Sequence, residues 1–230
     1  MKATRQQLQE LVHTVLHLLN EGMVDKILDQ VEPNDYWNKS HSEKIKKAYS
    51  AGQRDFGENY LQESVEKIEK LQDFDINWHF IGSVQSNKAK LISHNFDWVH
   101  SIDKLKTLEK INQHRRDLNK KINICIQVNI DQEDSKSGLN ISEIEDFLLE
   151  SRKFDMINLR GLMAIPKPQK THELQYKTFL RIKKIYDELV NKGYNLDTLS
   201  IGMSSDYSAA IEAGSTCIRI GTAIFGQREK

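Results

Sequence analysis

Short apolar runs and longer amphipathic stretches alternate along this chain from about residue 45 onward. Apolar residues at three- and four-residue spacing predict helices, and the uninterrupted apolar runs between them predict buried strands. The predicted helices cover residues 45–51, 60–71, 87–92, 105–118, 142–151, 172–192 and 208–213. The predicted strands cover residues 54–58, 78–81, 98–102, 122–130, 159–165, 199–203 and 217–220. Because each strand is entered from a helix, the pattern indicates a parallel α/β sheet.

The N-terminal segment extends this pattern less regularly. Residues 8–19 predict an additional amphipathic helix, with Gly22 as its stop. One further strand before Ser42 would give eight, the number that closes a (β/α)8 TIM barrel of about 250 residues, and an open doubly wound sheet is the alternative. Residues 34–42 are poor in apolar side chains, so this first strand is atypical. Without a Pro- or Gly-rich linker, we expect a single domain over residues 1–230.

The composition of the chain argues against nucleic-acid binding, a membrane segment and a metal site. Lys plus Arg and Asp plus Glu both number 33, so the formal net charge is zero and no basic excess suggests a nucleic-acid partner. We expect a cytoplasmic protein without a membrane segment, because no run approaches the ~18 apolar residues of a span and no signal-peptide core follows the N-terminus. Cys125 and Cys217 lie in apolar runs and are expected to be small buried hydrophobes. The histidine and cysteine spacing does not indicate a metal site.

Chemistry-bearing residues gather where the last two predicted strands end. In (β/α)8 barrels, phosphate often binds on the loops after strands seven and eight. Here Ser204 and Ser205 follow one strand and offer hydroxyls that can cap a helix, whereas Gly221 follows the other and allows close backbone approach. A helix N-terminus after each strand would favour an anion. Arg219, within an apolar run, would either form a buried ion pair or donate to a ligand; we favour the ligand.

At this point the chain resembles a known family. The matching segments follow one another in order: Ala51-Gly-Gln-Arg-Asp-Phe-Gly-Glu-Asn59-Tyr, Trp78-His-Phe-Ile-Gly-Ser-Val-Gln-Ser-Asn-Lys88, Val128-Asn-Ile, Ser135-Lys-Ser-Gly138, Arg160-Gly-Leu-Met-Ala-Ile-Pro166, and the two terminal segments over residues 200–214 and 215–226. This set is similar to the pyridoxal 5′-phosphate homeostasis protein family, relatives of the N-terminal barrel of alanine racemase. The resemblance implies a single (β/α)8 barrel that binds pyridoxal 5′-phosphate.

The resemblance also implies residue roles. Ser204, Gly221 and Thr222 would hold the phosphate, and Arg219 would face the pyridine nitrogen. Two further residues, at the ends of the second and third expected strands, would line the cofactor face: Asn59 and His79.

The family's Schiff-base lysine closes the first strand, and the best counterpart here is Lys39. Its spacing to the Ala-Gly-Gln-Arg motif is one residue short. The apolar run, the second lysine and the proline that surround the family's lysine are missing. A family member with impaired cofactor attachment therefore stays an alternative.

The implied function is cofactor storage, buffering or delivery, without turnover. An arginine at the pyridine nitrogen stays protonated and weakens the ring as an electron sink. Racemases of this fold add a second domain and a tyrosine from a partner subunit, which favours a non-catalytic monomer here. Transient partners would be apo-enzymes that use the cofactor. The alternatives are a racemase-like enzyme and a phosphosugar aldolase or isomerase.

Overall fold

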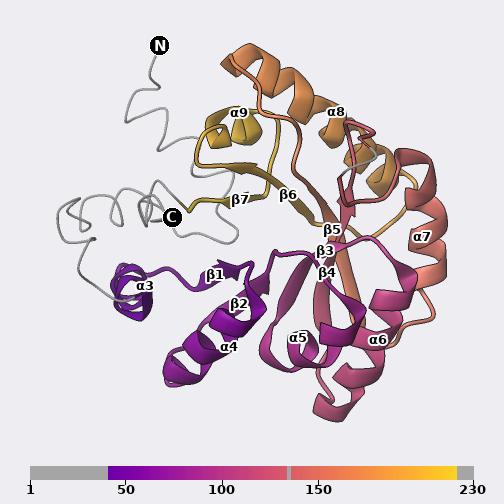
Figure 1. The fold of residues 1–230 in the computed structure, drawn as a ribbon. Coiled ribbons are helices and arrows are strands. Elements are labelled where there is room, and N and C mark those ends of the chain that lie inside the picture. Colours follow the sequence, from indigo (N-terminus) through magenta and orange to yellow (C-terminus); the bar gives the residue numbers. More distant parts are fainter. Residues whose placement is uncertain (1–40, 134–135, 222–230) are drawn as a thin grey trace.

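The computed structural model describes residues 41–133 and 136–221, in which seven parallel strands form one sheet. The strands are hydrogen-bonded in sequence order from β1 to β7, and the sheet curves into a nearly closed barrel with β1 and β7 on the same side of the molecule (Figure 1). Their bounds are β1 Asp55–Glu58, β2 Asn77–Phe80, β3 Trp98–Ile102, β4 Ile122–Val128, β5 Ile157–Ala164, β6 Thr198–Met203 and β7 Cys217–Arg219.

The helices connect successive strands, and α5 to α8 lie outside the curved sheet in Figure 1. The α-helices are α3 His41–Ser50, α4 Leu61–Lys70, α5 Ala89–Asn95, α6 Leu105–Arg115, α7 Ile144–Ser151, α8 His172–Asn191 and α9 Tyr207–Glu212. Short 3-10 turns adjoin three of them: η2 Ser86–Lys88, η3 Arg116–Leu118 and η4 Ile141–Glu143.

The two faces of the sheet bury different chemistry. Side chains alternate between faces along a strand. On β3, Val99 belongs to the large core cluster between sheet and helices, whereas Trp98 belongs to a small second cluster with Cys125 and Met163. His100, two residues after Trp98, is also buried. The second face therefore combines apolar and polar side chains, and it holds the site described below.

The seven strands predicted from apolar runs are confirmed, with every boundary within two residues. The predicted first strand over residues 34–42 is wrong at its end, because His41 and Ser42 form the first turn of α3. Polar residues there cannot supply a buried strand but suit an exposed helix, in which Glu43 pairs with Lys46 at 2.9 Å. The rest of that strand and the opening helix over residues 8–19 lie outside the described residues.

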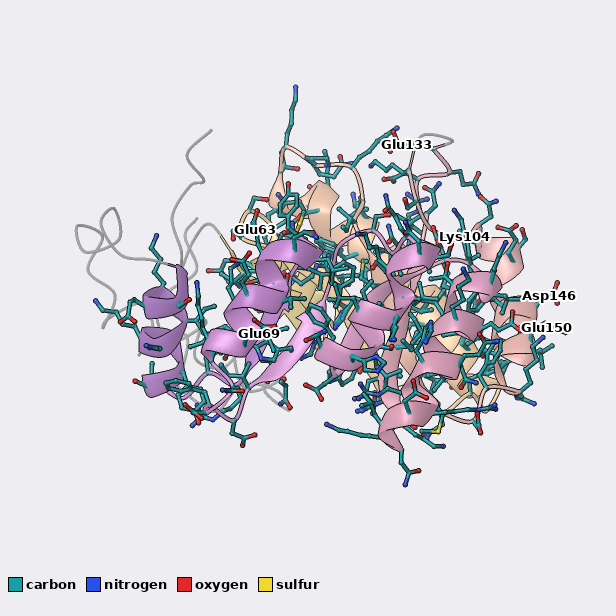
Figure 2. All side chains as sticks on the ribbon, turned by 60° about the horizontal axis from the view of Figure 1, so that its bottom comes forward. Glu63, Glu69, Lys104, Glu133, Asp146 and Glu150 are labelled. Carbon is teal, nitrogen blue, oxygen red and sulfur yellow. The ribbon has the colours of Figure 1, made fainter. Side chains whose placement is uncertain are left out.

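Charged side chains cover the outer surface. Figure 2 shows Glu63 and Glu69 extending from α4, and both are exposed. Within the part of the chain that the structure describes, no helix is long and apolar enough to cross a bilayer.

Candidate functional site

The carboxyl ends of β6 and β7 are joined by one hydrogen bond. Met203 pairs with Arg219 in the sheet register, and just beyond this pair the Gly221 amide donates to Ser204 Oγ at 3.1 Å. A Cβ built on Gly221 would meet no described atom within 4 Å. Among the described residues, the glycine thus leaves space beside a hydroxyl and a backbone amide, which is a suitable shape for an anionic group.

Gly202 sets the position of the loop after β6. Its φ of +93° is in the left-handed region, and a Cβ there would lie 2.5 Å from Ala210 Cβ on α9. Only glycine allows this close approach without displacing α9. The Met203 amide then donates to Asp206 Oδ1 at 2.7 Å, which turns the chain into α9.

The expectation that Ser204 and Ser205 cap this helix is wrong. Asp206 holds the N-cap position, and no side chain makes a cap hydrogen bond there. Ser204 Oγ instead accepts from Gly221, because the β6–β7 pairing brings that amide within reach. Since α9 has only six residues, the Ser204–Gly221 pair contributes more to this site than a helix dipole does.

Arg219 is a partly buried cation whose described hydrogen-bond partners are neutral oxygens. Its Nη1 donates to the Ser200 carbonyl and to Ser200 Oγ, both at 2.7 Å, and its Nη2 donates to the Ala164 carbonyl at 3.1 Å. No ion pair to a carboxylate forms within the described ranges, so the ion-pair alternative for Arg219 finds no support there. Burial lowers the pKa of the guanidinium. A ligand with an anionic or lone-pair acceptor would complement this charge.

His79, which the resemblance expects to line the cofactor face, belongs to a buried polar network. His79 is a residue of β2 and is 5% exposed. Nε2 lies 3.1 Å from Asp55 Oδ1, and Nδ1 lies 2.9 Å from His100 Nε2. The ring also stacks on Trp98 with a centroid separation of 5.3 Å. Both ring nitrogens are therefore already bonded within the barrel.

His100 continues this network to Arg219. Its Nδ1 lies 2.9 Å from Ser200 Oγ, which accepts from Arg219. Burial, followed by the nearby His79 and Arg219, lowers the pKa of His100 well below its usual value. His100 is therefore neutral at physiological pH.

A family model described as the alanine racemase N-terminal domain matches residues 40–229. The pyridoxal phosphate homeostasis protein of Escherichia coli (strain K12) is 44% identical over 188 residues, covering 80% of each chain. The chain belongs to the pyridoxal phosphate homeostasis protein family. The resemblance read from the motifs is thereby confirmed, as is the barrel of the alanine racemase N-terminal domain.

Solved structures agree with this membership. PipY of Synechococcus elongatus PCC7942 superposes with a TM-score of 0.78 without PLP and 0.76 with PLP bound, at 32% identity. In both cases the match covers 89% of this chain and 98% of PipY. Alanine racemase of Clostridium difficile 630 shares the fold at 16% identity and a TM-score of 0.69, and this chain matches 56% of its length.

The other residues predicted for a homeostasis-protein site are placed as follows. Asn59 is exposed directly after β1, and a Cβ on Gly82 would lie 2.2 Å from its carbonyl oxygen, so the ends of β1 and β2 are in close contact. Lys39 and Thr222 lie outside the described residues. The family match begins at residue 40, immediately after Lys39.

The two cysteines differ in exposure. Cys125 is fully buried, as predicted, and burial raises the pKa of its thiol well above the usual value. Cys217 is only partly buried, which corrects the expectation of a core position. As part of edge strand β7, it lacks a further described strand to cover it. In the described ranges, no group of His, Cys, Asp and Glu side chains is arranged to hold a metal ion.

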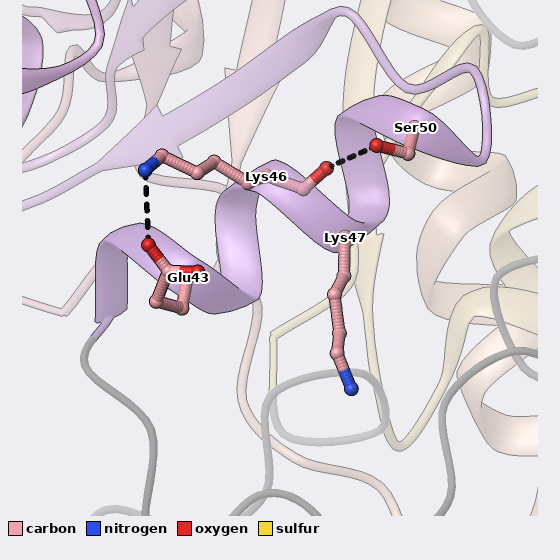
Figure 3. A pocket seen from close by; sticks show the side chains of 4 residues that line it. All are labelled: Glu43, Lys46, Lys47 and Ser50. Atoms are coloured by element: carbon pink, nitrogen blue, oxygen red, sulfur yellow. Dashed lines mark hydrogen bonds and ion pairs between the residues drawn. The ribbon is translucent and has the colours of Figure 1, made fainter.

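A groove on α3 is separate from this site. It measures about 340 Å³ and is lined by Glu43, Lys46, Lys47 and Ser50. Figure 3 shows that all four residues come from one helix, with Lys46 bonded to Glu43. Within the described ranges, none of the predicted binding residues lines it.

Sequence reasoning missed three residues of the buried network: Asp55, His100 and Ser200. Asp55 and His100 lie inside segments that were interpreted only as strands. The available signal was a polar residue at an alternate position of a buried strand, where it must find a partner.

Proposed function

We propose that this chain binds pyridoxal 5′-phosphate at the carboxyl ends of β6 and β7 and takes part in storing, buffering or delivering it, without turnover of its own. Relatives at 44% identity are named for pyridoxal phosphate homeostasis, and the related PipY has a structure with PLP bound. The observation that carries the proposal is the Ser204–Gly221 contact beside the partly buried Arg219, whose described partners include no carboxylate.

Three described residues would hold the cofactor. The Ser204 hydroxyl and the Gly221 amide, now bonded to each other, can both donate to a phosphate oxygen in the open space at Gly221. Arg219 would donate to the pyridine nitrogen. Asn59 and Thr222 would complete the contacts, as the family resemblance implies. The residues present therefore fit the cofactor.

Arg219 would disfavour turnover of amino acids. The bound cofactor supplies an aldehyde and an aromatic ring that can withdraw electrons. A guanidinium donates a hydrogen bond but keeps its proton, because arginine stays ionised in proteins even where burial lowers its pKa, as it does for Arg219. The pyridine nitrogen then stays unprotonated, which limits the electron withdrawal that amino-acid chemistry requires. This environment favours retention and release of the cofactor over catalysis.

The cellular setting is proposed from the same reasoning. The protein would act as a cytoplasmic monomer of one domain, with apo-enzymes that use the cofactor as transient partners. The continuous core from α3 to α9 supports a single domain.

A calorimetric titration tests the proposed function. Wild type should bind pyridoxal 5′-phosphate more tightly than pyridoxal, because only the former has an anionic group for Ser204 and Gly221. Arg219→Gln should weaken binding at least about tenfold, the effect of a lost charge-assisted hydrogen bond. Arg116→Gln is the matched control, since Arg116 is exposed on η3 and pairs with Asp155. Equal affinity of wild type for both ligands would refute the phosphate site.

Lys39 can be tested separately. We propose covalent attachment there, and borohydride reduction followed by peptide mass mapping should label this residue. A label on Lys44, Lys46 or Lys47, or on no lysine, would refute the assignment. Purified protein should form no D-alanine from L-alanine; formation would instead support a racemase-like enzyme.

A further inference from the structure

Five side chains form one continuous line across the barrel, from Asp55 on β1 to Arg219 on β7. The intermediate members are His79, His100 and Ser200 on β2, β3 and β6. Each link is between 2.7 and 3.1 Å long. The line therefore connects four separate strands to the arginine of the candidate site, and nothing in the proposed function assigns it a role.

With both histidine rings neutral, the two ends allow one consistent direction for every bond. An arginine only donates, and an ionised carboxylate only accepts. Asp55 therefore accepts from His79 Nε2, and in a network without a doubly protonated ring His79 Nδ1 is an acceptor. His100 Nε2 must then donate to His79 Nδ1.

The same logic continues to the other end. A neutral His100 that donates from Nε2 has an acceptor at Nδ1, which faces Ser200 Oγ and can receive its hydroxyl proton. The Ser200 oxygen then presents its lone pairs to Arg219 Nη1, which donates at 2.7 Å. Every donor points from Arg219 toward Asp55, and no two donors or two acceptors face each other.

Burial makes this order costly to disturb. His100 and Ser200 are 1% and 0% exposed, so two donors or two acceptors that faced each other there could not form hydrogen bonds with water instead. Desolvation lowers the pKa of His100 well below its usual value, in agreement with a neutral ring. The His79 ring is also fixed by its nearly parallel stacking on Trp98, at an interplanar angle of 6°. Neither ring can flip without losing contacts.

We propose that Asp55, His79, His100 and Ser200 form a one-directional hydrogen-bond chain that orients Arg219 for its ligand, and that Asp55 is its distant positioning residue. The hydrogen-bond chain keeps the hydroxyl proton of Ser200 pointing away from the guanidinium, so that Ser200 Oγ accepts a hydrogen bond from Arg219 Nη1. Ser200 and Ala164 together hold both Nη atoms. The Nε proton and one Nη2 proton have no acceptor among the described residues, and they are the donors available to a ligand.

The proposal that this hydrogen-bond chain orients Arg219 for a ligand rests on the proposed function. The direction of the hydrogen bonds, however, can be measured without any ligand. Long-range ¹H–¹⁵N spectra of the imidazole rings distinguish the tautomers of neutral histidine. In the ligand-free protein at neutral pH, His79 and His100 should both carry their proton on Nε2, with Nδ1 unprotonated. Signals can be assigned with His79→Gln and His100→Gln. A doubly protonated His79, or a proton on His100 Nδ1, would overturn the proposed direction.

Binding then tests the positioning role. Asp55→Ala removes the terminal acceptor and should weaken binding of pyridoxal 5′-phosphate roughly tenfold. Asp55→Asn keeps an acceptor oxygen and should restore most of the affinity. The absorption spectrum of the bound cofactor should shift in Asp55→Ala but not in the exposed control His94→Ala.

The outcomes separate the two proposals. If the wild-type protein does not bind the cofactor, the proposed function is refuted. The histidine tautomers then still test the direction of the hydrogen-bond chain. Wild-type protein that binds, with Asp55→Ala binding equally well and with an unshifted spectrum, refutes the positioning role alone. If Asp55→Ala does not fold, the histidine tautomers of the wild type still test the direction of the hydrogen-bond chain, and the titration of Asp55→Asn still tests the positioning role.

Discussion

Ser204 Oγ accepts a hydrogen bond from the Gly221 amide at 3.1 Å, which links the loops that follow β6 and β7. The two residues are separated by a helix and a strand in sequence, and the parallel pairing of β6 with β7 brings them together. The guanidinium of Arg219 is held beside the same strand ends. A donor pair for an anion and a partly buried cation thus occupy one end of the barrel.

Gly221→Ala should separate binding from stability. No described atom lies within 4 Å of the added methyl group, and Gly221 is not in the left-handed region, so the free energy of unfolding should change by less than about 0.5 kcal/mol. The methyl group would occupy the space proposed for phosphate and should lower cofactor affinity about tenfold or more. Urea unfolding and calorimetric titration measure the two effects. Unchanged affinity would place the phosphate elsewhere.

Gly202→Ala should destabilise the fold. The left-handed φ costs about 1–2 kcal/mol for a residue with a Cβ, and the 2.5 Å approach to Ala210 adds overpacking of about 1 kcal/mol or more. Gly193→Ala is the matched control, because its φ is +90° but its Cβ would meet nothing within 4 Å. Urea unfolding should show the larger loss for Gly202→Ala. Equal losses would mean that the contact with α9 contributes nothing.

Arg115 should be essential for stability because it joins several loops from inside the protein. It is 2% exposed, and its guanidinium donates to the backbone carbonyls of Ser93, Phe96, Lys120 and Lys121. Arg115→Met would leave these carbonyls without their donor and should cost about 3 kcal/mol. The neighbouring Arg116→Met removes only an exposed ion pair and should cost at most about 1 kcal/mol. Similar Tm values for the two variants would contradict this role.

Tyr186 should make stability fall in alkaline solution. Burial, assisted by nearby carboxylates, raises the pKa of Tyr186 to about 12, and its hydroxyl donates to the Leu196 carbonyl at 2.9 Å. An unfolded tyrosine ionises near pH 10, so between about pH 10 and 12 the unfolded state binds fewer protons and the free energy of unfolding decreases. Tyr186→Phe should be less stable by about 1 kcal/mol at pH 7. The difference should narrow above pH 10, and a constant difference would contradict the raised pKa.

The sheet could be predicted well from sequence because buried parallel strands must be apolar. Runs such as residues 98–102 and 122–130 carry that signal with little ambiguity, and β3 has the predicted bounds. The strand ends then place Ser204, Arg219 and Gly221 on one edge by topology alone. Helix starts were less predictable, since α3 begins at His41 in a polar segment without an apolar period.

The buried network could not be predicted because it depends on distances between non-adjacent strands. His100 and Ser200 are 100 positions apart in sequence, and only closure of the sheet brings them within 2.9 Å. The resemblance implies a place for His79 on the cofactor face, but it does not reveal that His79 pairs with Asp55 and His100. A linear pattern identifies a buried polar residue but not its partner.

A crystal structure of this protein with pyridoxal 5′-phosphate tests the central claim most directly. The account predicts phosphate oxygens within hydrogen-bond distance of the Gly221 amide and the Ser204 hydroxyl, with the pyridine nitrogen facing Arg219. A cofactor bound elsewhere at saturating concentration, with the Ser204–Gly221 hydrogen bond intact, would contradict it.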